Sequence, residues 1–357
     1  MEHQSHSLRE LRAADPSWSV PELMARLAKA LVSDGPALSL TETIVESVNS
    51  RIALVVTTTG SSGIAKEVGL TASALISSAR ASHKFIGAEF GETWSLLLPL
   101  NHIAGINVLI RSLELGTVPV DLRKTTGELP KVDYTAIVPT QLYKALHGNR
   151  ELLDHLINAK AVLVGGAALS AELRAQAQAV GIKVIETYGS TETCGGCVYD
   201  GKPLDGVEID CTGNKISIRG TTLAHSYLNA QMPLIEDGWY RTSDLGHLDN
   251  GKLIIDGRAD DVVLSGGVNI SIEAVARILA EKYPAIETAV TAIEDEKWGN
   301  ILCAFFVASP DDIDEVEVQS HLDGETFIKK FIYCDSLPVQ GIGKVNRAEL
   351  YRLAKES

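Results

Sequence analysis

Short, continuously apolar runs alternate with amphipathic segments between about residue 50 and residue 190. The apolar runs are WSLLLPL from Trp94, YTAIVP from Tyr134, AVLVGG from Ala161 and IKVIETYG from Ile182. The amphipathic segments between them predict helices at 103–116, 140–147 and 170–181. Strands without clean polar alternation are typical of parallel sheets, because helices cover both faces. We therefore expect an α/β fold with a largely parallel sheet, in which ligands bind at the carboxyl ends of the strands.

Two helices begin at residues that can cap them. Ser19 and Glu22 have the spacing of a capping box, and leucines follow at helical intervals until Gly35. The pattern predicts that this surface helix opens the fold. Thr71 can cap a second helix that runs to about Ala81.

The pattern changes after Gly201 to short strands separated by turn signals, in KISIRG, DGWYRTSDLG and GKLIID. These segments predict an antiparallel subdomain. From Asp261 onward, strands mix with a helix at 271–283, an acidic helix and a final helix near Asn346, which predicts a compact α+β domain of about 100 residues. We predict a large domain at 1–259 and a small domain at 260–357, joined by the polar stretch DGRADD.

Composition and charge limit the classes of function. The 357 residues are 45% hydrophobic, which is enough for a substantial core, and the net charge is −14. Such an acidic chain is not expected to bind nucleic acid or anionic membranes non-specifically. No apolar run is long enough to cross a bilayer, and the amino terminus lacks the pattern of a secretion signal, so we expect a cytoplasmic protein.

The five cysteines are expected to be reduced thiols rather than a disulfide framework. Cys194 and Cys197 form a CGGC pair that could belong to a redox or zinc site. Because the sequence has no second pair at ligand spacing, we favour small, buried residues at these positions.

Residues 52–70, IALVVTTTGSSGIAKEVGL, have the chemistry of a phosphate-binding loop. Gly60 and Gly63 let the backbone curl, and Lys66 supplies a positive charge. The loop differs from a P-loop because Ala65 precedes the lysine and Glu67 follows it. The hydroxyl donors are Thr57, Thr58, Thr59, Ser61 and Ser62. A polar hairpin turn is the alternative interpretation.

Four further stretches follow in a characteristic order: YGSTET at 188–193, WYRTSDLG around Asp244, GRADDVVLSGGVNIS at 257–271, and GIGKVNR with Lys344. Together with the loop at 52–70, they resemble the motifs of the adenylate-forming acyl-CoA synthetase superfamily. The resemblance extends over nearly the whole chain from about residue 50. It implies a two-domain ligase that uses ATP, Mg²⁺ and coenzyme A.

The resemblance implies how ATP is held. Residues 57–66 would hold its β- and γ-phosphates. Adenine would lie on the strand end formed by Gly165, Gly166 and Ala167, where small residues let a flat ring approach the backbone. Tyr188 would cover its other face, and Gly189 next to it is also expected at the cofactor site.

The same resemblance implies roles in the chemistry. Thr191 would reach a phosphate oxygen, and Glu192 would hold Mg²⁺, which prefers oxygen ligands. Asp244 would accept both ribose hydroxyls, and Arg258 would reach the phosphate and ribose. In isolation, each of these residues could equally be a core, capping or surface residue.

The small domain would contribute three features. Asp260 corresponds to the family's hinge, and Gly266 and Gly267 correspond to the passage for the pantetheine arm of coenzyme A. Lys344 corresponds to the lysine that bridges the attacking carboxylate and the α-phosphate, where its charge stabilises the transition state.

Some positions depart from the family pattern. Ala65 stands where proline is usual, and Glu67 and Ser243 stand where glycine is usual. Strand alternation predicts that Glu67 points away from Lys66. The loop begins so early that about 100 residues of the usual amino-terminal portion are expected to be absent.

Two stretches of sequence bear on which acid would be the substrate: LPLNHIAGINVLIRSLELG and YGSTETCGGCVYDGKPLDGV. They are most similar to the short actinobacterial 2-succinylbenzoate–CoA ligases of menaquinone biosynthesis. Gly195 and Gly196 could form a floor for a flat benzoate ring, and His102 could orient a carboxylate or be merely structural.

The resulting hypothesis is a two-step acid–CoA ligase that forms an acyl-adenylate. One alternative is a ligase for another aryl or fatty acid, and a second is a non-catalytic nucleotide-binding protein. Glu192, Asp244, Arg258 and Lys344 together argue against the second, because a binding module does not need the lysine. The expected partners are a small carboxylic acid, ATP and coenzyme A, with a homodimer plausible.

Overall fold

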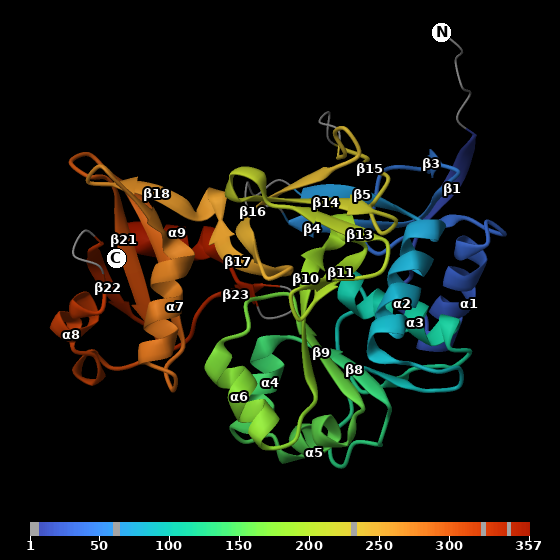
Figure 1. Cartoon of the computed structure of the whole chain (residues 1–357), viewed down its shortest axis with the longest axis horizontal. Coiled ribbons are helices and arrows are strands. Elements are labelled where there is room, and N and C mark those ends of the chain that lie inside the picture. Colours follow the sequence, from blue (N-terminus) through green and yellow to red (C-terminus); the bar gives the residue numbers. More distant parts are fainter. Residues whose placement is uncertain (1–6, 60–64, 230–233, 323–325, 341–343) are drawn as a thin grey trace, which may run out of the picture. The chain divides into compact units, whose positions relative to one another are not determined.

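The computed structural model describes residues 7–59, 65–229, 234–322, 326–340 and 344–357 (Figure 1). The chain forms two compact units. The first comprises Met1–Asp210, Ser217–Arg241 and Leu248–Leu253. The second comprises Cys211–Ile216, Thr242–His247 and Ile254–Ser357.

The first unit contains a six-stranded mixed sheet in the order β15-β5-β4-β2-β1-β3. Its strands are β1 (Leu8–Ala13), β2 (Ala37–Ser39), β3 (Ser47–Asn49), β4 (Ile52–Thr59), β5 (Ala65–Thr71) and β15 (Ser226–Tyr227). The central strand β4 begins with five buried residues and pairs parallel to β2 and antiparallel to β5. The sheet therefore presents the β4–β5 hairpin from a rigid, buried strand.

A seven-stranded sheet in the order β12-β11-β10-β9-β8-β6-β7 also belongs to this unit. The strands are β6 (Trp94–Leu96), β7 (Val120–Asp121), β8 (Tyr134–Ile137), β9 (Ala161–Gly165), β10 (Val184–Ser190), β11 (Gly195–Tyr199) and β12 (Lys202–Pro203). All pairs from β7 to β10 are parallel, and β11 and β12 continue antiparallel. The predicted α/β fold with a largely parallel sheet is confirmed.

Helices cover this sheet on both faces. The covering helices are α2 (Ala72–Ile86), α3 (Ile103–Glu114), α4 (Pro139–Leu146), α5 (Arg150–Asn158) and α6 (Ala171–Ala179), whereas α1 (Val20–Leu31) contacts β2 and β4 of the six-stranded sheet. Helix α2 contacts β4 and β5, and α3 contacts β6 and β8, so these two helices lie between the sheets (Figure 1). Apolar side chains of α4, α5 and α6 pack with β8, β9 and β10 in a separate core.

The capping residues are confirmed, but the helix ends and the start of the fold differ from the prediction. Ser19 and Glu22 form the capping box of α1, and Thr71 caps α2. Strand β1 precedes α1, so the expectation that a helix opens the fold is wrong. Only Leu11 of β1 is buried, which leaves little apolar signal. Helix α2 continues beyond Ala81, because its later polar residues are buried by tertiary packing.

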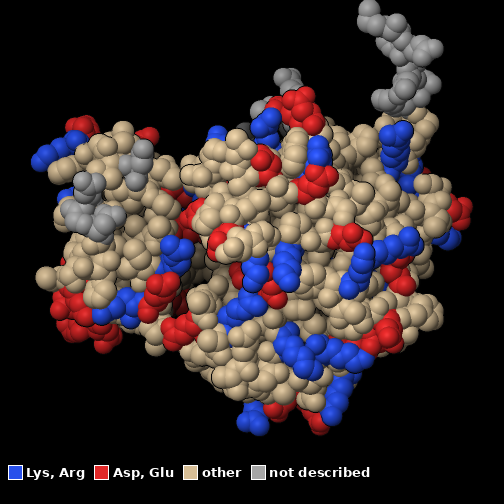
Figure 2. Space-filling model, viewed as in Figure 1, with Lys and Arg blue, Asp and Glu red and all other residues tan. Residues whose placement is uncertain are grey.

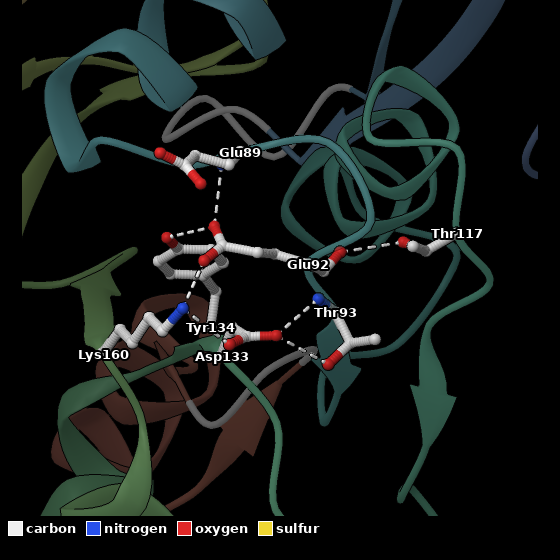
Figure 3. Close-up of polar contacts among 7 residues, drawn as sticks. All are labelled: Glu89, Glu92, Thr93, Thr117, Asp133, Tyr134 and Lys160. Carbon is white, nitrogen blue, oxygen red and sulfur yellow. Dashed lines mark hydrogen bonds and ion pairs between the residues drawn. The ribbon is translucent and has the colours of Figure 1, made fainter.

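Charged and polar side chains join the amino ends of three parallel strands in what we call the amino-end cluster: Glu92, Thr93, Asp133, Tyr134 and Lys160 (Figure 3). Lys160 Nζ pairs with Glu92 and lies 3.0 Å from Asp133 Oδ1. The Tyr134 hydroxyl donates to Glu92 Oε2 at 2.7 Å. The Thr93 amide donates to Asp133 Oδ2 at 2.8 Å. These contacts fix the ends of β6, β8 and β9 that are opposite to the expected ligand-binding edge.

A four-stranded sheet follows in the order β13-β14-β16-β17, and the division between the two units runs through it. Its strands are β13 (Val207–Asp210), β14 (Lys215–Gly220), β16 (Tyr240–Asp249) and β17 (Lys252–Arg258). These strands confirm the segments predicted after Gly201.

The remainder of the second unit is α+β, as predicted. Its elements are β18 (Val262–Ser265), β19 (Val268–Ser271), α7 (Ile272–Lys282), β20 (Thr288–Asp295), β21 (Gly299–Phe306), α8 (Glu315–Ser320), β22 (Ile328–Tyr333), β23 (Val339–Gln340), β24 (Lys344–Val345) and α9 (Arg347–Glu356). Alternate residues of β21 enter two cores, one packed with α7 and α8 and the other with α9. Four 3₁₀ turns complete the described structure: η1 (Thr191–Thr193), η2 (Thr212–Asn214), η3 (Ala259–Asp261) and η4 (Pro310–Asp312).

Figure 2 shows basic side chains interspersed with acidic ones on the face drawn, with acidic residues gathered over α8. Exposed carboxylates there include Asp314, Glu315 and Glu317. Within the described ranges, every helix is too short or too polar to cross a membrane.

Candidate functional site

The predicted phosphate loop connects the two strands of an antiparallel hairpin. Thr58 pairs with Lys66, and Thr59 with Ala65. The Thr57 and Thr41 hydroxyl oxygens are hydrogen-bonded at 2.6 Å, and the Thr58 hydroxyl donates to the Lys66 carbonyl at 3.4 Å. The side chain of Thr59 and the whole of Gly60, Ser61, Ser62 and Gly63 lie outside the described residues.

Lys66 and its neighbour Glu67 have different partners. Lys66 Nζ lies 4.9 Å from the centroid of the Tyr227 ring, a cation–π contact. Glu67 Oε1 accepts a hydrogen bond from the Thr43 hydroxyl at 2.9 Å. The two side chains are thus held apart, as strand alternation predicts.

Tyr227 connects Lys66 to the carboxylate proposed for magnesium. Its hydroxyl donates to Glu192 Oε1 at 3.0 Å, and strand β15 places it beside β5. Burial, followed by the negative charge of Glu192, raises the pKa of Tyr227, so the phenol keeps its proton and remains a donor. Sequence reasoning missed Tyr227, because its two-residue strand reaches β5 only through tertiary pairing.

Thr191 and Glu192 lie in the 3₁₀ turn η1 after β10, with exposed fractions of 9% and 8%. The Ala224 amide donates to the Glu192 carbonyl at 2.8 Å, which fixes the backbone there. Among the described residues, no group of three or more acidic, histidine or cysteine side chains could hold a metal. A single buried carboxylate nevertheless fits Mg²⁺, which commonly uses one or two carboxylates, substrate phosphates and water.

The small residues expected under adenine lie where two parallel strands end. Gly165 ends β9 and pairs with Thr187 of β10, directly before Tyr188. A Cβ at Gly165 would collide with the Thr187 hydroxyl, and Gly166 has a φ of +85°. Both glycines are therefore required by the backbone and its packing. The adjacent residues Ala167 and Gly189 are exposed at the same edge.

Gly195 and Gly196 begin β11, and packing explains both. Asn107 Nδ2 donates to the Cys194 carbonyl at 2.9 Å, and a Cβ on Gly195 would collide with that amide. A Cβ on Gly196 would lie 3.0 Å from Tyr199 Cε1. His102 occupies the N-cap position of α3, the helix that carries Asn107.

Cys194 and Cys197 are free and buried, as favoured from their sequence context. Burial raises the pKa of both thiols. Neither is therefore activated as a thiolate at neutral pH.

Arg111 is a buried cation that sequence reasoning missed. Its side chain lies on α3, one turn after Asn107, and the residue is 4% exposed. Its Nη2 donates to the Tyr199 hydroxyl at 3.0 Å, and the guanidinium lies 5.1 Å from the Trp94 ring centroid. Its Nε is buried and has no hydrogen-bond partner within the described structure.

The second unit holds the residues predicted for ribose. Arg258 Nη1 forms an ion pair with Asp244 Oδ1 at 2.9 Å, bringing β17 and β16 together. The Asp244 amide donates to the Thr242 hydroxyl at 3.0 Å.

The other predicted residues of this unit lie on short turns and strands. Asp260 lies in η3, and its side chain is outside the described structure. Gly266 and Gly267 have φ values of +61° and +90° between β18 and β19. Positive φ at both central residues is the geometry of a two-residue hairpin turn. Lys344 pairs with Gln340, and its side chain is likewise not described.

Similarity to known proteins agrees with this arrangement. Residues 4–225 match the AMP-binding enzyme family. The probable 2-succinylbenzoate–CoA ligase of Mycobacterium tuberculosis is 37% identical, covering 92% of this chain and 94% of that protein. The 2-succinylbenzoate–CoA ligase of Escherichia coli is 32% identical, covering 80% of this chain and 68% of that protein.

A solved structure shares the fold. The o-succinylbenzoate CoA synthetase of Bacillus subtilis, in complex with the acyl-adenylate intermediate OSB-AMP, has a TM-score of 0.73 and 25% identity. The match covers 95% of this chain and 82% of that one. Family, relatives and fold all agree with the resemblance to adenylate-forming acyl-CoA synthetases, and the chain belongs to the AMP-binding enzyme family.

Proposed function

We propose that the chain is an ATP-dependent acid–CoA ligase whose substrate is 2-succinylbenzoate and whose product, 2-succinylbenzoyl-CoA, serves menaquinone biosynthesis. The observation that supports it most is the Lys66–Tyr227–Glu192 arrangement, which joins a cation for phosphates to a buried carboxylate suited to Mg²⁺. The similarity to relatives named for this activity supports the choice of acid.

The reaction has two steps. A carboxylate oxygen attacks the α-phosphorus of ATP and pyrophosphate leaves, giving acyl-AMP. The thiolate of coenzyme A then attacks the acyl carbon, and AMP leaves as the thioester forms. Mg²⁺ held by Glu192 would offset phosphate charge during the first step.

The protein's own residues would orient these groups. The hydroxyls at 57–62 and Lys66 would bind the β- and γ-phosphates, and Thr191 would donate to a phosphate oxygen. Adenine would lie between Tyr188 and the strand end at Gly165, and Asp244 would accept from the ribose. Preorganised donors of this kind lower the barrier because they need not reorient during the reaction.

The second step would use the small domain differently. We propose that residues 260–357 rotate about Asp260 relative to residues 1–259, so that Lys344 serves adenylation and the Gly266–Gly267 turn admits the pantetheine arm. A turn without side chains offers a narrow passage for this arm. Arg258, paired with Asp244, would contact the phosphate and ribose.

The diacid needs a cation for its second carboxylate, and Arg111 is our candidate. It is buried, its Nε has no hydrogen-bond partner among the described residues, and α3 places it one turn beyond the Asn107 that packs against Gly195. A desolvated guanidinium binds a carboxylate strongly when both N–H groups are used.

We further propose a cytoplasmic location, where ATP and coenzyme A are available. The predicted homodimer can be tested by light scattering over a series of protein concentrations.

Mass spectrometry of the purified protein with ATP, Mg²⁺ and a panel of acids, with and without coenzyme A, tests this function. We expect AMP and a thioester from 2-succinylbenzoate only when coenzyme A is present, with benzoate and fatty acids inert. Activity with a different acid and none with 2-succinylbenzoate would support the proposed mechanism but contradict the proposed substrate. No AMP from any acid would favour the non-catalytic nucleotide-binding protein.

A further inference from the structure

Five charged side chains lie close together in the second unit and form what we call the hinge cluster: Asp244, Arg258, Asp261, Glu273 and Arg347. Arg258 pairs with Asp244, and Arg347 Nη1 donates to Asp261 Oδ1. Burial raises the pKa of Glu273, and the nearby negative charge of Asp261 raises it further. The cluster adjoins the proposed hinge at Asp260.

The Asp261–Arg347 pair joins a buried carboxylate to an exposed guanidinium. The Asp261 side chain is 4% exposed, whereas the Arg347 side chain is 53% exposed. Asp261 Oδ2 is buried and has no hydrogen-bond partner among the described residues. Arg347 therefore supplies the principal compensation for a desolvated carboxylate, and such a contact is costly to break.

Arg347 is also the first residue of α9, three positions after Lys344. Between them, the Asn346 amide donates to the Pro338 carbonyl at 2.8 Å, and the Asn346 side chain caps α9 through the Glu349 amide at 3.2 Å. Lys344 itself lies in the two-residue strand β24. A strand this short has few contacts of its own, so anchors at its end determine its position.

We propose that the Asp261–Arg347 ion pair is a positioning contact that ties the segment carrying Lys344 to the residue directly after the hinge. The proposal rests on the proposed function. Asp261 follows Asp260, so rotation at the hinge would move Asp261 and Lys344 together. Without the pair, the Lys344 segment would be less restricted, and adenylation would slow because small misplacements of a catalytic group are expensive in rate.

The test compares the two half-reactions. For Arg347→Gln, we expect acyl-adenylate formation to fall on the order of 10-fold, while thioester formation from preformed acyl-adenylate stays within about 2-fold. Arg352→Gln is the matched control, because Arg352 also lies on α9 but pairs with the exposed Glu349 and Glu356. Arg347→Lys, which keeps the charge, should restore part of the rate and replaces the glutamine variant if that variant does not fold.

A second comparison uses Asp261→Asn alone and combined with Arg347→Gln. If the pair acts as a unit, the double variant should lose little more adenylation rate than either single variant. Equal losses in both half-reactions, or no loss in adenylation, would overturn the positioning role while leaving the ligase intact. A wild-type protein that forms no acyl-adenylate from any acid would overturn both proposals.

Discussion

The amino-end cluster of the first unit and the hinge cluster of the second use similar residues to opposite effect. Burial alone would raise the pKa of Glu92, but hydrogen bonds from Lys160, the Glu89 amide and Tyr134 together lower it (Figure 3). In the hinge cluster, burial and a nearby carboxylate raise the pKa of Glu273. A cluster in which every carboxylate accepts hydrogen bonds stabilises a fold. A cluster that brings carboxylates of like charge close together stabilises it less.

This difference indicates where function lies. Fully paired charges at the amino ends of β6, β8 and β9 have no reason to change partners. Asp261 has a buried oxygen for which the described part of the chain supplies no donor, and Asp244 and Arg258 of the same cluster are proposed to contact a nucleotide. A carboxylate that is only partly paired next to the proposed hinge is consistent with a segment that adopts more than one position during the reaction.

Lys344→Ala, in the second unit, should have the largest effect. It tests whether substitutions in this unit affect catalysis rather than stability. We expect adenylation to fall on the order of 10²-fold, because the lysine charge is most useful in the transition state. Pyrophosphate release measures the rate, and the free energy of unfolding should stay unchanged. Lys355→Ala, a lysine on α9, is the control. An unchanged rate for Lys344→Ala would remove this residue from the mechanism.

Lys160→Met tests the first unit. Lys160 pairs with two carboxylates, and its loss should lower the free energy of unfolding, as measured by urea denaturation. Adenylation by the folded protein should match the wild type. Lys183→Met, at an exposed lysine before β10, is the control. If Lys160→Met instead slowed adenylation in the folded protein, the assignment of this cluster to stability alone would be wrong.

Substitution of His83 should give the smallest effect. It tests a contribution of the first unit to the pH dependence of the free energy of unfolding rather than to catalysis. Burial, then the charge of Arg111, lowers its pKa to about 4, and its Nε2 has no partner in the described structure. Between that pKa and its unfolded value of about 6.5, the unfolded chain binds more protons, so stability falls as pH falls.

From pH 7 to pH 6, His83 should account for a loss of about 0.7 kcal/mol in the free energy of unfolding. The variant His83→Gln should lack this contribution, and the exposed His147→Gln should retain it. Denaturant titrations at the two pH values measure the difference. Identical pH dependence in His83→Gln and the wild type would show that His83 does not titrate differently on folding.

Local sequence signals predicted much of this architecture. Apolar runs identified the strands of the parallel sheet, and Ser19 and Thr71 marked helix starts, because these features act within a few residues. Strand β1 was missed because it has one buried residue, and α5 because only a short turn separates it from α4. For β1, tertiary contacts outweigh a weak local pattern, whereas α5 has a clear one, with Leu152 and Leu156 at helical spacing after the Asn149 cap.

The candidate site divides in the same way. Motif order predicts Lys66, Glu192, Asp244 and Arg258 as site residues, because their chemistry can be recognised in short strings. Tyr227, Arg111 and the Asp261–Arg347 pair could not be found in this way, because their partners are distant in sequence. Side chains that orient a site depend on the fold, whereas those that define its chemistry recur in motifs.

The parallel strands β8 and β9 have their amino ends fastened by the amino-end cluster, while their carboxyl ends lead toward the proposed nucleotide site. Substitutions at one end can therefore accumulate with little effect on the other. Such a separation would let related ligases acquire new acid preferences without first losing the stability needed to tolerate the mutations.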